Sequence, residues 1–332
     1  ESADALTVPR KQGFLFAGWY LDAGLNNAVP YPYIPTGNVT FYAKWEQEPA
    51  PSASFTVDEK GVLTAAEARG DVVLPERVNG VTVTQIGQRV FEKNQEITSV
   101  SLPDTVQLVG YAAFNGCKNL KAVDLGEGVQ RIHDIAFQNC SALESIEFPA
   151  SLRSISSDVF KNTGLRSVSL NKVESVGDYA FAECKQLSSL DLGVVQAFGR
   201  SVFLDCVALT EVSLPETVAG SGIELFGGCT ALAKVDLPES GIALQYNAFV
   251  GTSCAAAAEN WKDGMLIIDG YLFGANEKFK GTSVLRLPEG IVSVAAAAMS
   301  ASYGAMGCVD SLSSVVFPQS IRSIGSKAFY NC

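Results

Sequence analysis

Residues 136–149 read Ala-Phe-Gln-Asn-Cys-Ser-Ala-Leu-Glu-Ser-Ile-Glu-Phe-Pro, and the opening Ala-Phe-x-x-Cys phrase returns along the chain. Identical phrases begin at Ala113, Ala180 and Ala328. Phrases with one or two elements changed are anchored on Phe91, Phe160, Phe203, Phe226 and Phe249. From Phe91 to Phe249 the anchors lie 23, 23, 23, 21, 22, 23 and 23 residues apart. A period of this length predicts a solenoid, in which each repeat forms one coil stacked on its neighbours.

Each repeat also carries the pattern Leu-x-x-Val-x-Leu, as in Leu120, Val123 and Leu125. Because side chains alternate along a strand, we expect the Val and the last Leu to point into the core. These phrases resemble the BspA type of leucine-rich repeat, which is roughly 23 residues long and occurs in bacterial surface proteins. The resemblance covers residues 55–332. It implies a β-rich, right-handed solenoid with short helical or 3-10 turns, and about ten coils would span roughly 50 Å.

The first 46 residues follow a different pattern. Gly13–Tyr20 and Val39–Trp45 are rich in aromatic residues, alternate, and are separated by the Pro- and Gly-rich residues 30–37, which predicts two strands around a turn region. The pair is similar to the Listeria-Bacteroides repeat, a small β-grasp-like module whose opening strand would precede Glu1. We therefore expect a partial module at 1–46, an extended linker at 47–54 and the solenoid at 55–332.

Two parts of the solenoid depart from the repeat. Residues 55–90 are expected to form an N-terminal cap with strands at 55–57, 62–63, 72–74 and 81–86. Between residues 252 and 308 the repeat contains insertions, one of them predicted to be a hairpin around Asp269-Gly270 and the other at 300–307. Met299, which follows Ala298, is expected to replace one Phe anchor. Loops on a rigid scaffold often carry function.

Composition limits the classes of function. The formal net charge of −11 disfavours nucleic acid and anionic lipid as partners. The chain contains no run of about 18 apolar residues, so we expect no membrane span. It begins at Glu1 and stops at Cys332 within a repeat, which predicts a piece of a longer protein and an apolar end face on the last coil. The family resemblance implies an extracellular or cell-surface location in a bacterium.

Cysteines occupy the third position after the Phe anchor in six repeats, where other repeats have Asn94, Thr163 and Thr252. This exchange indicates that the position needs a small group that can hydrogen-bond the turning backbone. Parallel side chains in a ladder do not converge on a zinc ion. Neighbours such as Cys117 and Cys140 would stand about 4.8 Å apart, so a disulfide between them is left open.

Catalytic residues are scarce in this sequence. The single histidine, His133, stands where other repeats have glycine, as at Gly87 and Gly110, so we interpret it as a turn substitution. A triad of the Ser-His-Asp or Cys-His kind would have to use it. We find no phosphate-binding loop, nucleophile elbow or zinc-protease helix. The sequence therefore predicts no enzyme, no cofactor and no metal site.

The outward residues of the strands define the candidate binding face. The column after Val contains Ser101, Asp124, Glu147, Ser169, Asp191, Ser213 and Asp236. Adjacent Asp124 and Glu147 should lie roughly 5 Å apart, near the carboxylate spacing of retaining glycosidases, but any two neighbouring rungs give this distance. A solvated face is the simplest interpretation. A surface for a basic or hydroxyl-rich partner and a weak Ca²⁺ site are the open alternatives.

Three functions can be compared on these grounds. The first is a non-enzymatic surface or secreted recognition protein that adheres to a host or bacterial surface protein through the solenoid face. The second is a glycan-binding module that uses exposed aromatic side chains near the insertions, with candidates Trp261, Tyr271, Phe273 and Tyr303. The third is an enzyme, which would need an enclosed polar pocket. We expect the first.

Overall fold

The computed structural model describes residues 14–30, 37–47, 53–279, 281–300 and 311–332. The chain divides into two compact units, Glu1–Ser52 and Ala53–Cys332. Each is described separately below.

The described part of the first unit is an antiparallel pair of strands, β1 (Phe14–Tyr20) and β2 (Tyr42–Gln47). The pairing shifts between Phe16 and Gly18, and Gly18 adopts a φ of 126°, which glycine tolerates best. The Trp19 and Phe41 rings lie 6.3 Å apart between centroids. The two predicted strands are thus confirmed. Residues 31–36 lie outside the described residues, and the β-grasp-like architecture stays a prediction.

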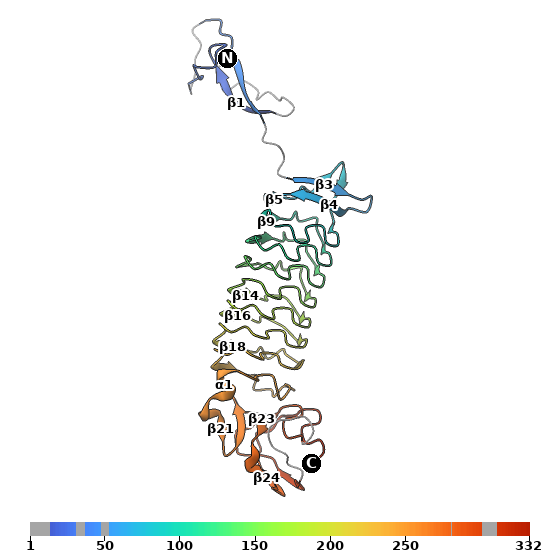
Figure 1. Ribbon diagram of the computed structural model, residues 1–332, viewed down its shortest axis with the longest axis vertical. Helices are drawn as coiled ribbons and strands as arrows, with labels where there is room; N and C mark the ends of the chain where they lie inside the picture. Colours follow the sequence, from blue (N-terminus) through green and yellow to red (C-terminus); the bar gives the residue numbers. More distant parts are fainter. Residues whose placement is uncertain (1–13, 31–36, 48–52, 280, 301–310) are drawn as a thin grey trace. The chain divides into compact units, whose positions relative to one another are not determined.

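The second unit is a stack of similar coils, which confirms the predicted leucine-rich-repeat solenoid (Figure 1). The Leu-x-x-Val-x-Leu segments form short parallel strands, which we call the LxxVxL strands. They are β5 (Gly70–Val73), β9 (Ile97–Ser101), β11 (Ala122–Asp124), β14 (Ser167–Ser169), β16 (Ser189–Asp191), β18 (Glu211–Ser213), β20 (Lys234–Asp236), β24 (Val284–Arg286) and β26 (Ser314–Val316).

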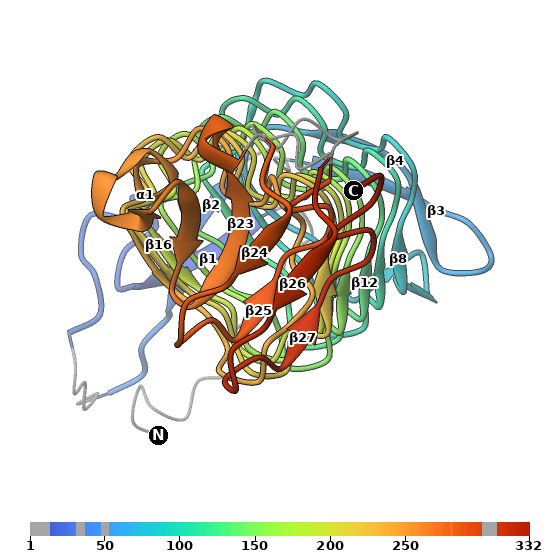
Figure 2. The same ribbon diagram turned by 90° about the horizontal axis from the view of Figure 1, so that it is seen from below.

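A second sheet, which the sequence did not predict as a continuous sheet, runs unbroken along another side of the coils. We call it the two-residue sheet, because all of its strands except β3 and β4 are two residues long. Its strands are β3 (Ala53–Val57), β4 (Val62–Ala68), β8 (Gln85–Ile86), β10 (Leu108–Val109), β12 (Arg131–Ile132), β13 (Ser154–Ile155), β15 (Ser175–Val176), β17 (Ala197–Phe198) and β19 (Gly220–Ser221). Figure 2 shows β16 and β12 on different sides of the array. Strands of two residues are too short to show an alternating pattern, so only the pairing between coils reveals them.

The Phe anchors form the centre of the core. Eight rings from Phe91 to Phe249 stack in sequence with centroids 4.9 to 5.7 Å apart and planes within 13° of parallel. All eight are buried. Repeats of 21 to 23 residues can therefore share one continuous aromatic stack, because each coil advances by about one strand spacing.

Glycine recurs four residues before most anchors, where neighbouring coils approach closely. A Cβ added to Gly87 would lie 2.3 Å from the carbonyl oxygen of Leu63 in the preceding coil. At the equivalent position His133 is exposed, and its amide donates to the Val109 carbonyl as the Gly110 amide donates to that of Ile86. His133 is therefore a turn residue, as predicted.

The N-terminal cap covers the first coil with a hairpin. Strand β4 pairs in parallel with β8, and β3 pairs with the outer edge of β4 in the antiparallel direction. A smaller hairpin joins β6 (Arg77–Val78) and β7 (Val81–Thr82) through Asn79 and Gly80, both with positive φ. The strand predicted over 81–86 is thus divided between β7 and β8.

The first insertion is the predicted hairpin. Helix α1 (Ser253–Ala256), the 3-10 helix η2 (Ala258–Asn260) and β21 (Trp261–Lys262) lead into β22 (Met265–Ile268) and β23 (Tyr271–Ala275). The turn residues Asp269 and Gly270 have φ of 47° and 78°. Strand β23 pairs in parallel with β25 (Ser293–Val294), which pairs with β27 (Ser323–Ile324). The 3-10 helix η3 (Glu277–Phe279) follows β23.

The last coils keep the register of the repeat. The amide of the buried Met299 donates to the Ala328 carbonyl, as anchor amides do in earlier coils, so Met299 replaces a Phe as predicted. The final coil exposes large apolar side chains, which matches the predicted apolar end face: Val316, Phe317, Ile324 and Tyr330. Of the second predicted insertion, 301–307 lie outside the described residues.

Candidate functional site

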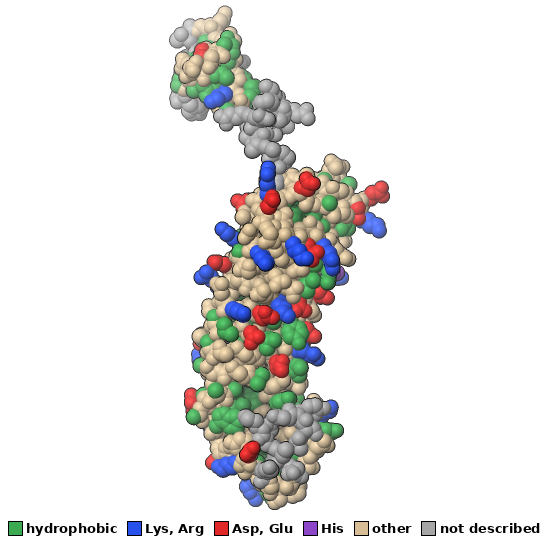
Figure 3. Space-filling model, viewed as in Figure 1, with side chains coloured by type: hydrophobic (Ala, Val, Ile, Leu, Met, Phe, Trp, Pro, Cys, Tyr) green, Lys and Arg blue, Asp and Glu red, His purple; other side chains and the backbone are tan. Residues whose placement is uncertain are grey.

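The column of residues that the sequence predicts as a candidate binding face lies on the surface of the solenoid. Asp124, Glu147, Asp191, Ser213 and Asp236 are exposed, while Ser101 and Ser169 are half-buried. In β11 and β14, for example, the central Val123 and Val168 are buried beneath them. The alternation predicted from the sequence therefore places this column outward. Figure 3 shows acidic and basic side chains interspersed over the side of the solenoid that it draws.

Several carboxylates of this face also hold the backbone. The Asp191 carboxylate accepts from the Gly193 amide at 3.0 Å and from the Ser169 hydroxyl of the neighbouring coil at 2.7 Å. Ser213 donates in the same way to Asp236 at 3.3 Å. Hydrogen bonds from Ser99 and Thr98 lower the pKa of Asp71, the acidic residue at the N-terminal end of this face. These hydrogen bonds orient the carboxylates of Asp71, Asp191 and Asp236 before any partner binds.

The LxxVxL sheet is interrupted, which the sequence did not predict. Its pairings are β5–β9–β11, β14–β16, β18–β20 and β24–β26. Residues 143–149 contain no strand, so the expected rung pairing of Asp124 with Glu147 does not form. In this coil Phe148 replaces the final Leu, and its ring packs against Phe160 at 5.6 Å. Since this segment forms no strand, the two carboxylates are not paired rungs.

A groove opens where β16 and β18 are not hydrogen-bonded to each other. This face groove has a volume of about 350 Å³ and is lined by Ser188, Ser189, Leu190, Glu211, Val212, Ser213, Lys234 and Asp236. Glu211 and Lys234 form an ion pair at 3.3 Å with 67% and 78% of their side chains exposed. The 21-residue spacing from Phe160 to Phe181 precedes it in the sequence, and the 22-residue spacing from Phe181 to Phe203 contains its first residues. The groove presents serine hydroxyls and charges of both signs.

The aromatic candidates for glycan contact are mostly internal. Tyr271 is 0% and Phe273 2% exposed, so neither ring can stack on a sugar at the surface. Trp261 is half-buried, and its indole N–H donates to the Ala255 carbonyl at 2.9 Å. Tyr303 lies outside the described residues. Trp261 is thus the one described candidate with accessible ring surface, and the structure does not bring these residues together on an open face.

The cysteines act as the sequence predicts, as small hydrogen-bonding residues of the turn. Cys117 Sγ donates to the Phe91 carbonyl at 2.9 Å, and Cys140 Sγ to that of Phe114 at 3.2 Å. Each thiol thus links its coil to the preceding anchor. In contrast, Thr163 Oγ1 donates to Phe160 within its own coil. All seven described cysteines are free thiols, while Cys308 lies outside the described residues.

Burial makes these thiols poor nucleophiles. It raises the pKa of Cys117 from 9.0 to about 12 and that of Cys184 to about 11. We therefore expect a thiol reagent at pH 8 to modify the exposed Cys332 in the native protein, and to modify the six buried cysteines after denaturation. Because the folded pKa is raised, the thiols stabilise the fold below pH 9, and this contribution is lost as the pH approaches 12.

Thiol titration with and without denaturant measures this directly. Rapid native modification of Cys117 or Cys140, located by mass spectrometry, would contradict the buried ladder. A Cys332→Ser variant provides the control, because among the described cysteines it removes the exposed thiol and leaves the buried ones unchanged.

Two protein-family models match the chain. The model of the BspA type leucine-rich repeat region matches residues 74–188, 169–280 and 301–332 in six copies. The chain belongs to this family. The model of the Listeria-Bacteroides repeat domain matches residues 1–44. Both resemblances inferred from the sequence are confirmed, and no curated protein matches the chain.

This BspA-type protein is similar to several solved structures. A leucine-rich cell surface protein from Faecalibacterium prausnitzii is 26% identical, with a TM-score of 0.54 over 86% of this chain and 74% of that chain. A leucine-rich repeat protein from T. pallidum is 29% identical over 62% of this chain and 89% of that chain, with a TM-score of 0.43. One from Bacteroides ovatus is 18% identical over 86% and 92% of the two chains, with a TM-score of 0.44.

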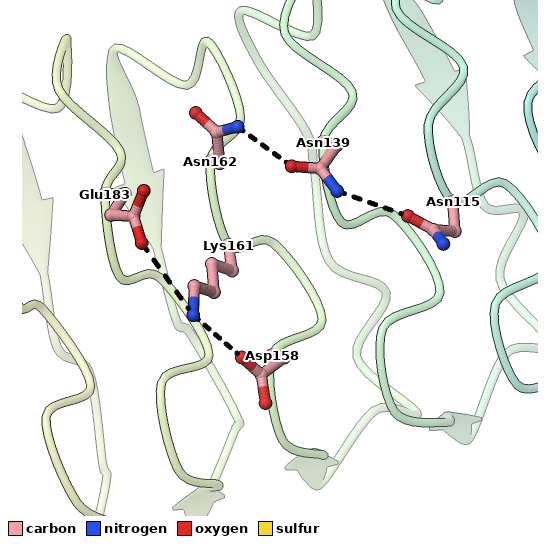
Figure 4. A network of polar contacts seen from close by, with 6 residues as sticks. All are labelled: Asn115, Asn139, Asp158, Lys161, Asn162 and Glu183. Atoms are coloured by element: carbon pink, nitrogen blue, oxygen red, sulfur yellow. Dashed lines mark hydrogen bonds and ion pairs between the residues drawn. The ribbon is translucent and has the colours of Figure 1, made fainter.

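A polar network on the anchor turns holds the BspA-type coils together (Figure 4). Asn162 donates to Asn139 at 2.8 Å, and Asn139 donates to Asn115 at 3.5 Å. Lys161 lies between Asp158 and Glu183, with Nζ to oxygen distances of 3.5 and 3.8 Å. Burial raises the pKa of Asp158, and the Lys161 charge opposes that increase. The network joins neighbouring coils and leaves its charges paired, which fits a structural role.

No group of three or more His, Cys, Asp or Glu residues that could hold a metal ion occurs among the described residues. Within the same residues, no helix is long and apolar enough to cross a membrane.

Proposed function

We propose that this protein is a non-enzymatic recognition protein of the bacterial surface or exterior that binds a protein partner through the LxxVxL face. The face groove is the centre of contact. Support comes from the family, whose repeats build interaction surfaces, and from the Faecalibacterium prausnitzii relative, which is described as a cell surface protein. The first 44 residues match a second repeat family that accompanies such surface proteins.

The observation that carries the proposal is the composition of the face groove on a rigid support. Glu211, Lys234 and Asp236 are exposed in it, and the ring stack from Phe181 to Phe226 packs in the core of the same coils. The groove contains two carboxylates, Glu211 and Asp236, and one ammonium group, Lys234. This excess of negative charge favours a partner segment that carries Lys or Arg. Such complementarity mainly raises the association rate and the selectivity of binding.

A charge-swap experiment tests this. The double variant Glu211→Lys/Lys234→Glu keeps the ion pair and exchanges its positions, and because an exposed pair contributes only about 0–1 kcal/mol, folding should be unchanged. The matched control Arg153→Glu/Glu174→Arg swaps an exposed pair beside the two-residue sheet, where the charged atoms lie 3.6 Å apart. The immobilised full chain is used to capture partners from extracts of bacterial and host surface proteins.

We expect the wild-type chain and the control to retain a partner that protease treatment of the extract removes, and the groove variant to bind it at least about tenfold more weakly. Equal retention by the groove variant and the wild type would contradict the proposal. Loss of capture after glycosidase treatment, with protease treatment having no effect, would instead indicate a glycan ligand.

A further inference from the structure

The regular ladder of the solenoid stops on one side of the first insertion. In regular coils the anchor amide and the amide two residues later donate to the next coil: Phe226 N to Ala248 O and Gly228 N to Val250 O, both at 2.8 Å. The following rung begins normally, because Tyr246 N donates to Ala296 O at 3.0 Å. Beyond Tyr246 the coils separate. Within the described chain, the amides of Phe249 and Gly251 have no acceptor in the next coil.

The inserted hairpin enters this opening. Phe273 of β23 packs edge-on against Phe249, with centroids 5.3 Å apart and planes at 90°, and ends the parallel stack. Next to it is a pocket of about 440 Å³, the wedge pocket. Its walls come from the anchor turn of the last regular coil, from α1 and from the hairpin. Its larger side chains are Tyr246, Phe249, Val250, Trp261, Leu266 and Phe273.

The lining of the wedge pocket indicates its chemistry. None of its lining residues is an acid, a lysine, an arginine or a histidine, and its surface is mostly carbon. Phe249 and Gly251, whose amides lack acceptors, belong to the lining. In regular coils the amides at these two positions point toward the next coil. After Phe249 the pocket lies on that side of the coil. At the rim, Val250 is 50% exposed because no regular coil follows to cover it.

Buried hydrogen bonds fix the hairpin that closes the pocket. The Asp269 carboxylate accepts from the Leu237 amide at 2.6 Å, a role that the Asp236 carbonyl plays for Leu214 in the preceding coil. The Tyr271 hydroxyl donates to the Pro238 carbonyl at 2.6 Å and accepts from the Ile242 amide at 2.9 Å. The pocket walls are therefore preorganised, which reduces the entropic cost of ligand binding.

We propose that the wedge pocket binds a small, neutral ring compound that carries a hydrogen-bond acceptor, such as an aromatic ketone or amide. The ring lies against the aromatic and aliphatic side chains that line the pocket, and the acceptor receives the free amides of Phe249 and Gly251. An ion is disfavoured because no lining charge compensates its desolvation. The pocket volume lies in the range of small-molecule sites, which runs from about 300 to 1,000 Å³.

The test uses 6-propionyl-2-dimethylaminonaphthalene, a neutral fluorophore with a ketone, and the full chain. In a Trp19→Phe/Trp45→Phe background, Trp261 is the sole remaining tryptophan and reports on the pocket. We expect saturable binding of one probe per chain, a blue shift of the probe and quenching of Trp261. N-phenyl-1-naphthylamine, which has no carbonyl, should bind about tenfold more weakly, because the amides stay unpaired.

Variants at exposed positions locate the site. Val250→Glu brings a charge to the rim and should weaken probe binding at least about tenfold. Val73→Glu, at a valine that is 74% exposed near the other end of the solenoid, should leave binding unchanged. Ala256→Phe fills the pocket from its exposed edge, keeps Trp261 as the sole tryptophan and gives a second, uncharged test. Non-saturable binding, equal affinity for the two probes, or full affinity in either pocket variant would overturn the proposal.

Discussion

Replacement of Phe137 by alanine is expected to lower the free energy of unfolding by about 3–5 kcal/mol. The ring is fully buried and lies between Phe114 and Phe160, with centroid distances of 5.1 and 5.5 Å. Its removal leaves a cavity that the neighbouring coils cannot fill, because their positions are fixed by backbone hydrogen bonds on both sides. The loss combines burial of the ring with stacking on two neighbours.

Chemical denaturation, monitored by circular dichroism, measures this effect. Asp124→Ser is the matched control in the adjoining coil, because Asp124 is exposed and a serine can still accept a hydrogen bond from the Gly126 amide. We expect the control to change stability by less than about 0.5 kcal/mol. Equal midpoints for Phe137→Ala and the wild type would show that the anchors do not form the core.

Tyr271→Phe is expected to destabilise the protein by about 1–3 kcal/mol, although only one oxygen atom is removed. The turn from Pro238 to Ile242 is one residue longer than the equivalent Pro215–Val218 turn, and the Tyr271 hydroxyl bridges the gap. Without the hydroxyl, the Ile242 amide loses its acceptor in a buried position. The Pro238 carbonyl still accepts a hydrogen bond from the Gly241 amide. The loss of stability therefore comes mainly from the unpaired Ile242 amide.

Thermal unfolding of Tyr271→Phe and of Tyr111→Phe separates the hydroxyl effect from a general effect of this substitution. The Tyr111 ring contacts the Arg89 guanidinium at 5.5 Å, a contact that phenylalanine preserves. We expect the melting temperature of Tyr111→Phe to match that of the wild type. If both variants have the melting temperature of the wild type, the Tyr271 hydroxyl does not stabilise the longer turn.

The sequence predicted the parts of this fold that repeat. The spacing of the Phe anchors indicated the solenoid, and the exchange of Cys with Thr163 and Thr252 identified a hydrogen-bonding turn position. Alternation around Val123 and Val168 predicted which side chains face outward. These inferences hold because each depends on a residue type that recurs in the same local environment in every coil.

The features that arise between coils were not predicted. The two-residue sheet has no periodic pattern of its own, and its strands exist only through pairing with neighbours. The face groove and the wedge pocket appear where pairing between coils fails, at β16–β18 and after Tyr246. No local pattern encodes such a failure. The shortened anchor spacings of 21 and 22 residues and the insertion after Thr252 were the available signals, and neither specifies a distance between coils.

Hydrogen–deuterium exchange of the full chain, with and without its captured protein partner, tests the proposed recognition face most directly. We predict that binding slows exchange in residues 188–191, 211–213 and 234–236, which line the face groove, and leaves residues 153–155 and 174–176 of the two-residue sheet unchanged. Protection confined to the two-residue sheet, with the groove segments exchanging as in the free chain, would contradict recognition through the LxxVxL face.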